Sequence, residues 1–109
     1  MNKDSKEAFI TRINALLEQL DHTISIDDKA VKMEVQKAYI AINRPEKVAL
    51  QVKVVPDAIR EMDRTFQKMA VAKRYAFTTE QNELLNELRT LGRQSLQDSA
   101  IGVINPVGW

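Results

Sequence analysis

Few side chains in this sequence have the type and spacing that chemistry requires. His22 is the only histidine, and the chain has no cysteine, so no set of ligands with zinc-site spacing is present. Asp27 and Asp28 could act as an acid–base pair or bind a metal ion. They also precede a stretch of helical periodicity, where carboxylates cap the first turn and oppose the helix dipole, and we favour that structural role. Without a nucleophile elbow or a phosphate-binding glycine loop, the sequence predicts no catalytic, cofactor or metal site.

Three basic residues, Arg60, Arg64 and Lys68, recur every four positions and would form one stripe along a helix. Such a stripe can bind an acidic partner or the anionic inner leaflet of a membrane. It can equally be a solvated face whose charge is balanced by neighbouring carboxylates. The solvated face is the simpler interpretation, and both remain open.

Composition limits the function classes. The chain has 109 residues, 44% hydrophobic and 28% charged, which is typical of one globular domain spanning 1–109. Its net charge of +1 argues against a dedicated nucleic-acid binder. No secretory leader and no apolar stretch of bilayer-spanning length are seen, so we expect a cytoplasmic protein, in contact with the membrane at most peripherally.

The elements that must position these side chains are helices. Apolar residues recur at spacings of three and four over 4–20, 28–43, 57–75 and 79–91, and three glycines are too few for an all-β fold. The segment 46–55 fits either a short helix or an extended connector. Four amphipathic helices with short links predict an all-α, antiparallel four-helix bundle.

Local signals set the expected boundaries. Asp4 or Ser5 would cap the first helix, and Pro56 would open the third, because proline lacks only an N–H that the first turn does not need. Thr78 and Gln81 form a capping box at the start of the fourth. Gly92 stands where a left-handed cap would end it.

The remaining segment, 93–109, is nearly uncharged and ends on the only tryptophan. Ile104, Val107 and Trp109 would anchor it to the bundle. Burying Trp109 alone would contribute about 2–3 kcal/mol. We therefore expect a C-terminal tail packed on the helices.

The stretch around the fourth helix resembles the immunity proteins of pediocin-like (class IIa) bacteriocins. The chain and this family share a Phe-Thr pair followed by acidic and amide residues and then leucines. In both, a helix end and a tail with a tryptophan come next. The matching run is Tyr75-Ala76-Phe77-Thr78-Thr79-Glu80-Gln81-Asn82-Glu83-Leu84-Leu85, with Glu87-Leu88 and Leu91-Gly92-Arg93. The chain departs from the family pattern at 46–55 and in its tail.

The resemblance implies a cytoplasmic four-helix bundle that protects a bacteriocin producer from its own pore-forming peptide. Proteins of this family are thought to bind the mannose-phosphotransferase permease from inside, once the bacteriocin has engaged it. They are not enzymes and need no cofactor, nucleic acid or small-molecule substrate. The C-terminal half carries specificity in the family, so we expect Arg93, Gln94 and Gln97 to meet the partner together with the stripe on the third helix.

Two other classes fit the residues. A small helical adaptor or regulator would need only an exposed binding face. A small all-helical enzyme of chorismate-mutase type would need arginines and lysines converging on a buried anion site between helices.

Overall fold

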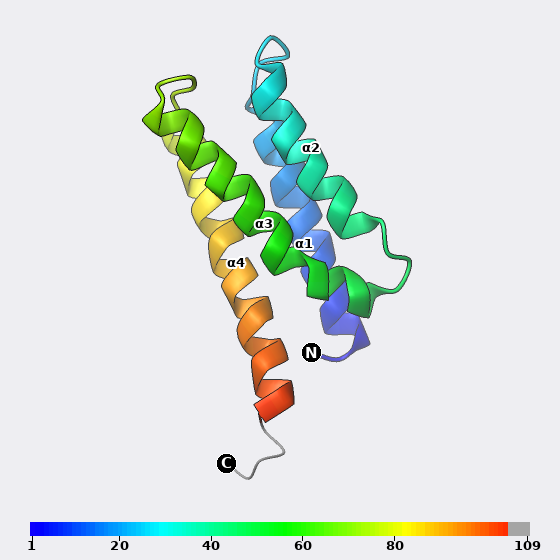
Figure 1. The fold of residues 1–109 in the computed structure, drawn as a ribbon. Coiled ribbons are helices and arrows are strands. Elements are labelled where there is room, and N and C mark those ends of the chain that lie inside the picture. Colours follow the sequence, from blue (N-terminus) through cyan, green and yellow to red (C-terminus); the bar gives the residue numbers. More distant parts are fainter. Residues whose placement is uncertain (105–109) are drawn as a thin grey trace.

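The structure, a computed structural model, describes the backbone of residues 1–104 and the side chains of residues 1–95. This part of the chain is all-α, as predicted: α1 (Lys3–His22), α2 (Lys29–Asn43), α3 (Val48–Val71) and α4 (Thr79–Ile104). Consecutive helices run in opposite directions, which makes an antiparallel four-helix bundle (Figure 1). None of the described helices has a segment long and apolar enough to cross a membrane.

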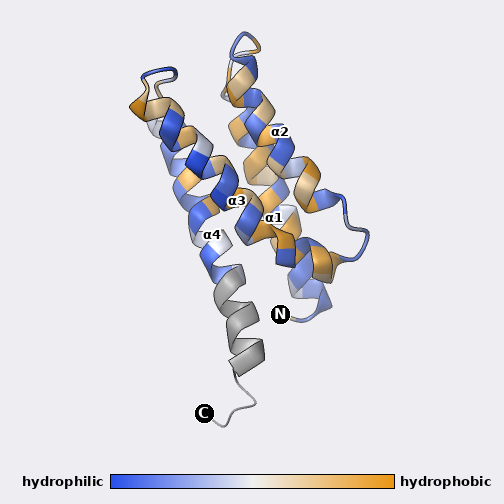
Figure 2. Ribbon diagram, viewed as in Figure 1, coloured by the Kyte–Doolittle hydropathy of each residue, from blue (hydrophilic) through white to orange (hydrophobic). Residues whose placement is uncertain are grey.

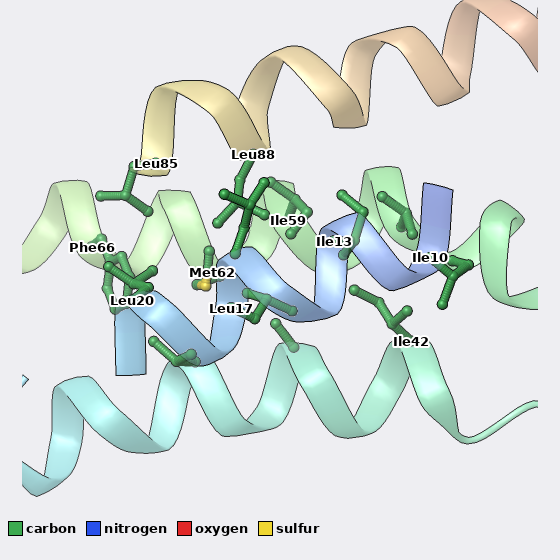
Figure 3. Packing of buried hydrophobic residues seen from close by; sticks show 14 of the residues in the cluster. Ile10, Ile13, Leu17, Leu20, Ile42, Ile59, Met62, Phe66, Leu85 and Leu88 are labelled. Carbon is green, nitrogen blue, oxygen red and sulfur yellow. The ribbon is translucent and has the colours of Figure 1, made fainter. Parts of the chain in front are cut away.

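The central pair of the bundle is α1 and α3. These two helices contact one another and each contacts both α2 and α4, whereas no Cα atoms of the described residues of α2 and α4 come within 8 Å of each other. Apolar and polar residues alternate around each helix (Figure 2), which is the amphipathic pattern that the spacing predicted. The apolar stripes meet in one core (Figure 3), whose most completely buried apolar side chains are Ile13, Leu16, Leu17, Leu20, Val35, Ile42, Val55, Met62, Phe66, Leu85 and Leu88.

The caps of the first two helices differ in detail from the prediction. Asn2, rather than Asp4 or Ser5, caps α1, because its side-chain oxygen accepts the Ser5 amide at 2.8 Å. Asp28 occupies the N-cap position of α2, but its side chain makes no capping hydrogen bond. Its carboxylate still lies at the positive end of the helix dipole.

The third helix is longer at its start than predicted. Residues 48–55, left open between helix and connector, are the first two turns of α3, and Val52 and Val55 are buried there. Pro56 therefore lies inside the helix and does not open it. A proline has no N–H to donate, so the carbonyl four residues earlier, on Val52, loses its helical partner.

A side chain of α4 replaces that missing donor. The hydroxyl of Ser95, which is fully buried, donates to the Val52 carbonyl at 3.0 Å. An unpaired buried carbonyl would cost about 1–3 kcal/mol. The bond between α4 and α3 removes that cost, and it explains why Pro56 is tolerated inside α3.

The end of α3 has the geometry of a Schellman motif. The Arg74 amide bonds the Met69 carbonyl at 2.9 Å and the Lys73 amide bonds the Ala70 carbonyl at 3.1 Å. Lys73 has the left-handed φ of 57° that this motif requires. Glycine adopts this conformation without strain, whereas it costs a lysine about 1–2 kcal/mol. The helix ends at Val71, before the predicted limit at 75.

The start of α4 confirms the predicted capping box. The Thr78 amide donates to Gln81 Oε1 at 2.9 Å, and the Gln81 amide donates to Thr78 Oγ1 at 3.1 Å. Gln81 is fully buried, and its Nε2 also reaches the Thr23 carbonyl at 3.2 Å, Thr23 Oγ1 at 3.1 Å and the Tyr75 hydroxyl at 2.9 Å. One residue therefore ties the end of α1 to the α3–α4 loop.

The predicted helix stop at Gly92 is wrong. The helix continues to Ile104, and Gly92 is a buried residue in its middle, packed against Ile59 of α3. An added Cβ at position 92 would lie 3.8 Å from Ile59, an ordinary contact distance, so the helix contact does not require glycine there. The Ser95 hydrogen bond fixes the turn that follows. The backbone of residues 93–104 is thus helical and not a folded-back tail. Residues 105–109, with the predicted anchors Val107 and Trp109, and the side chain of Ile104 lie outside the described part.

Candidate functional site

A shallow hollow between α3 and α4 brings together predicted site residues from both helices. Its volume is about 200 Å³, and its lining consists of Pro56, Ile59, Arg60, Asp63, Arg89, Gly92 and Arg93. Ile59 and Gly92, which pack together where the two helices meet, are both part of this lining. We call this feature the arginine hollow.

One arginine of the hollow is held by the protein itself. Arg89 donates to Asp63 Oδ1 through Nε at 2.8 Å and also through Nη2, and its Nη1 donates to Asn86 at 2.6 Å. The Asp63 and Arg89 side chains are only 16% and 30% exposed. This ion pair joins α3 to α4 and fixes the shape of the hollow.

The other two arginines, Arg60 on α3 and Arg93 on α4, make weaker contacts within the protein. Arg60 pairs with Asp57 one turn earlier at 3.3 Å, with both side chains largely exposed. Such a surface pair contributes little, about 0–1 kcal/mol. Arg93 makes a long contact of 3.5 Å with Thr90 Oγ1. With Asp63 neutralising one of three arginines, the lining keeps an excess of positive charge and can bind carboxylate or phosphate oxygens in the bidentate manner of guanidinium groups.

The structure separates the remaining predicted residues from the hollow. Arg64 and Lys68 are exposed on α3 but do not line it, and Gln94 is exposed on α4. Gln97 lies on α4, with a side chain outside the described part. Arg93 lies within α4 and not in a tail after it, because α4 continues for eleven residues beyond Arg93.

Sequence reasoning missed Arg89. The signal was its spacing of four residues from Arg93, which places both on one helix face. That signal was lost because the helix was expected to end at Gly92, between Arg89 and Arg93. The continuation of α4 through Gly92 is what puts Arg93 into the same hollow.

A second, larger groove lies between α1 and α2. It has a volume of about 490 Å³ and is lined by Leu17, Glu18, Asp21, His22, Val35, Gln36, Tyr39 and Ile40. The Asp21 carboxylate is held there by Lys32 Nζ at 3.2 Å. His22 lies at the rim, and within the described residues no three histidine or carboxylate side chains are grouped as metal ligands would be.

Of the arginines of the hollow, Arg60 and Arg93 are exposed and Arg89 is partly exposed. Of the polar and charged residues in the described part, those that are fully buried are Gln81 and Ser95, and neither is cationic. The hollow is therefore suited to recognition of a group on a partner's surface, not to enclosure of a small anion.

The fold is an all-α bundle with a basic hollow on its α3–α4 hairpin. Comparison of the chain with protein-family models, curated proteins and solved structures finds no match in any of the three.

Proposed function

We propose that this chain is an immunity protein that protects a bacteriocin-producing cell from a pediocin-like pore-forming peptide. It would bind the mannose-phosphotransferase permease from the cytoplasmic side after the bacteriocin has engaged it, without catalysis or a cofactor. The observation that supports this function is the coincidence of two features on one hairpin. The residues that resemble the family, 75–95, and the arginine hollow both belong to the α3–α4 hairpin.

The hairpin is suited to recognition because its two helices are fixed to each other. The Asp63–Arg89 ion pair and the Ser95–Val52 hydrogen bond lie on either side of the Gly92 contact along α4. Side chains presented by a fixed backbone lose less conformational freedom on binding, so each contact contributes more to affinity.

A helical adaptor for another protein is the second candidate. The same hollow favours it, because arginines recognise carboxylates on any acidic partner. The two functions differ in the partner and not in the binding face.

A protection assay tests the proposal. The chain is expressed in a bacterium that is sensitive to pediocin-like bacteriocins, and growth inhibition is measured across a panel of such peptides. Protection against one or a few peptides is expected. Failure to protect against any of them, with the protein shown to be expressed and folded, would contradict the proposal and favour the adaptor.

Variants then test the binding face. The double variant Arg60→Gln/Arg93→Gln removes the two arginines of the hollow that make only weak, exposed contacts within the protein, and it should abolish protection. Its matched control, Lys29→Gln/Lys53→Gln, removes the same charge from exposed positions outside the hollow and the third-helix stripe, and it should protect fully. Equal protection by both variants would remove the hollow from the proposal.

A further inference from the structure

The corner where α3 turns into α4 has an unusual charge distribution. From residue 64 to residue 79 the sequence has four basic residues and no acidic one: Arg64, Lys68, Lys73 and Arg74. All four are exposed, and none has an ion-pair partner in the part of the chain that the structure describes. We call residues 68–74 the corner. It presents three positive charges that have no ion-pair partner among the described residues.

An apolar side chain stands among these charges. Val71 is 84% exposed, the highest value for a large apolar residue in the described chain, and Ile26 follows at 78%. Both lie at the same end of the bundle, because the loop after α1 and the loop after α3 are tied together through Gln81 and Thr23 (Figure 1). Exposed apolar residues next to basic ones are typical of surfaces that meet a lipid headgroup layer.

The backbone at Lys73 adds an independent observation. Its φ of 57° belongs to the position of a Schellman motif where glycine is favoured. The sequence places a lysine there and so keeps a cationic side chain at the tip of the corner although the backbone disfavours it. A strained residue at an exposed tip points to a role outside the fold.

We propose that the corner formed by residues 68–74 contacts an anionic membrane surface. Val71 would enter the boundary between headgroups and acyl chains, while Lys68, Lys73 and Arg74 bind lipid phosphates. A convex tip with a protruding apolar side chain suits a deformable bilayer better than a rigid protein surface, which would need a matching pocket. This inference does not rest on the proposed function, and it involves a different surface from the arginine hollow.

The neighbouring loop determines how the bundle would lie. Asp27 and Asp28 follow Ile26 directly and would be repelled by anionic lipid. The bundle should therefore tilt, with the α3–α4 corner against the lipid and the α1–α2 loop away from it. Val71 and not Ile26 is then the apolar contact.

Vesicle co-sedimentation of the full chain tests the proposal. The two vesicle types are phosphatidylcholine alone and equal parts of phosphatidylcholine and phosphatidylglycerol. We expect binding to the anionic vesicles only, with weaker binding at higher salt because ions screen the basic side chains. Lys73→Gly should weaken binding about fivefold, since each basic residue near the surface contributes about 1 kcal/mol.

Paired controls separate lipid contact from folding. Lys73→Gly relieves the left-handed strain, so its melting temperature should be unchanged or higher while its lipid binding falls. Val71→Ser should also reduce binding several-fold. Lys53→Gln and Leu50→Ser remove a basic and an apolar exposed side chain near the opposite end of α3 and should bind as the unaltered chain does. No binding to anionic vesicles at low salt, or equal losses in the corner variants and their controls, would overturn the proposal; an acidic protein surface would then be the partner to test at this corner.

Discussion

The Ser95 hydroxyl donates a hydrogen bond to the Val52 carbonyl at 3.0 Å, and Val52 is the residue whose helical partner is removed by Pro56. The two ends of this bond are 43 residues apart in sequence. The bond lets α3 continue through a proline and holds α4 against it beyond Gly92. Pro56 and Gly92, which normally mark the first turn and the end of a helix, therefore both lie inside helices at this one contact.

Removing the Ser95 hydroxyl should destabilise the bundle. Ser95→Ala leaves the buried Val52 carbonyl unpaired, and we expect a loss of about 1–3 kcal/mol in the free energy of unfolding, measured by urea denaturation. Thr90→Ala, an exposed hydroxyl deletion on the same helix, should change stability by no more than about 0.5 kcal/mol.

The proline provides the complementary test. In the Ser95→Ala background, Pro56→Ala restores an N–H that can bond Val52 within α3, so most of the lost stability should return. A double-mutant cycle with four unfolding curves gives the coupling between the two positions. Additive effects would show that Ser95 does not compensate for Pro56.

Gly92→Ala should stabilise the protein. An added Cβ would lie 3.8 Å from Ile59, an ordinary van der Waals distance, and alanine is favoured over glycine inside a helix by about 1 kcal/mol. If Gly92 were instead a left-handed cap, as the sequence suggested, the same substitution would destabilise by about 1 kcal/mol. The sign of the shift in thermal unfolding therefore decides between the two roles.

Gln81→Leu should be strongly destabilising. The variant loses the side-chain half of the capping box and the bonds to Thr23 and Tyr75, and we expect about 2–4 kcal/mol less stability in denaturant titration. Gln67→Leu, which changes an exposed glutamine on α3, serves as the matched control. Similar losses for both variants would mean that the buried network contributes nothing.

Deleting residues 96–109 should leave the helices formed. The core side chains that the structure describes lie between Ile10 and Leu88, so we expect a helical far-UV spectrum and a cooperative transition, with some loss of stability because Ser95 becomes terminal. Under the proposed function this variant should lose protection. Full protection by the shortened chain would show that these residues take no part in it.

The sequence was sufficient for the helix faces and insufficient for the helix ends. The spacing of apolar residues identified the buried stripes of α1, α2 and α3 and the segment of α4 up to Leu91, because burial follows the periodicity of the helix itself. The capping box of Thr78 and Gln81 was also predictable, since both partners are local. The helix boundaries predicted at Pro56 and Gly92 were wrong. Whether a helix continues through these residues depends on contacts with another helix, which the local sequence does not show.

The same limit applies to the candidate site. Arg60 and Arg93 were each identified separately, one as part of a stripe and the other as part of a tail. Their shared hollow requires α4 to continue past Gly92 and Arg89 to be held by Asp63. The exposed corner at Val71 and Lys73 also escaped prediction, because the sequence indicated a helix up to residue 75 and a left-handed lysine has no sequence signature.

The buried amide of Gln81 has a consequence for the order of folding. Its bonds to Thr23 join positions 58 residues apart, so they can form only after α1 and α4 have docked. Interactions that form late stabilise the native state more than the folding transition state. Loss of this amide should therefore accelerate unfolding far more than it slows folding, which makes Gln81 a determinant of the lifetime of the folded bundle.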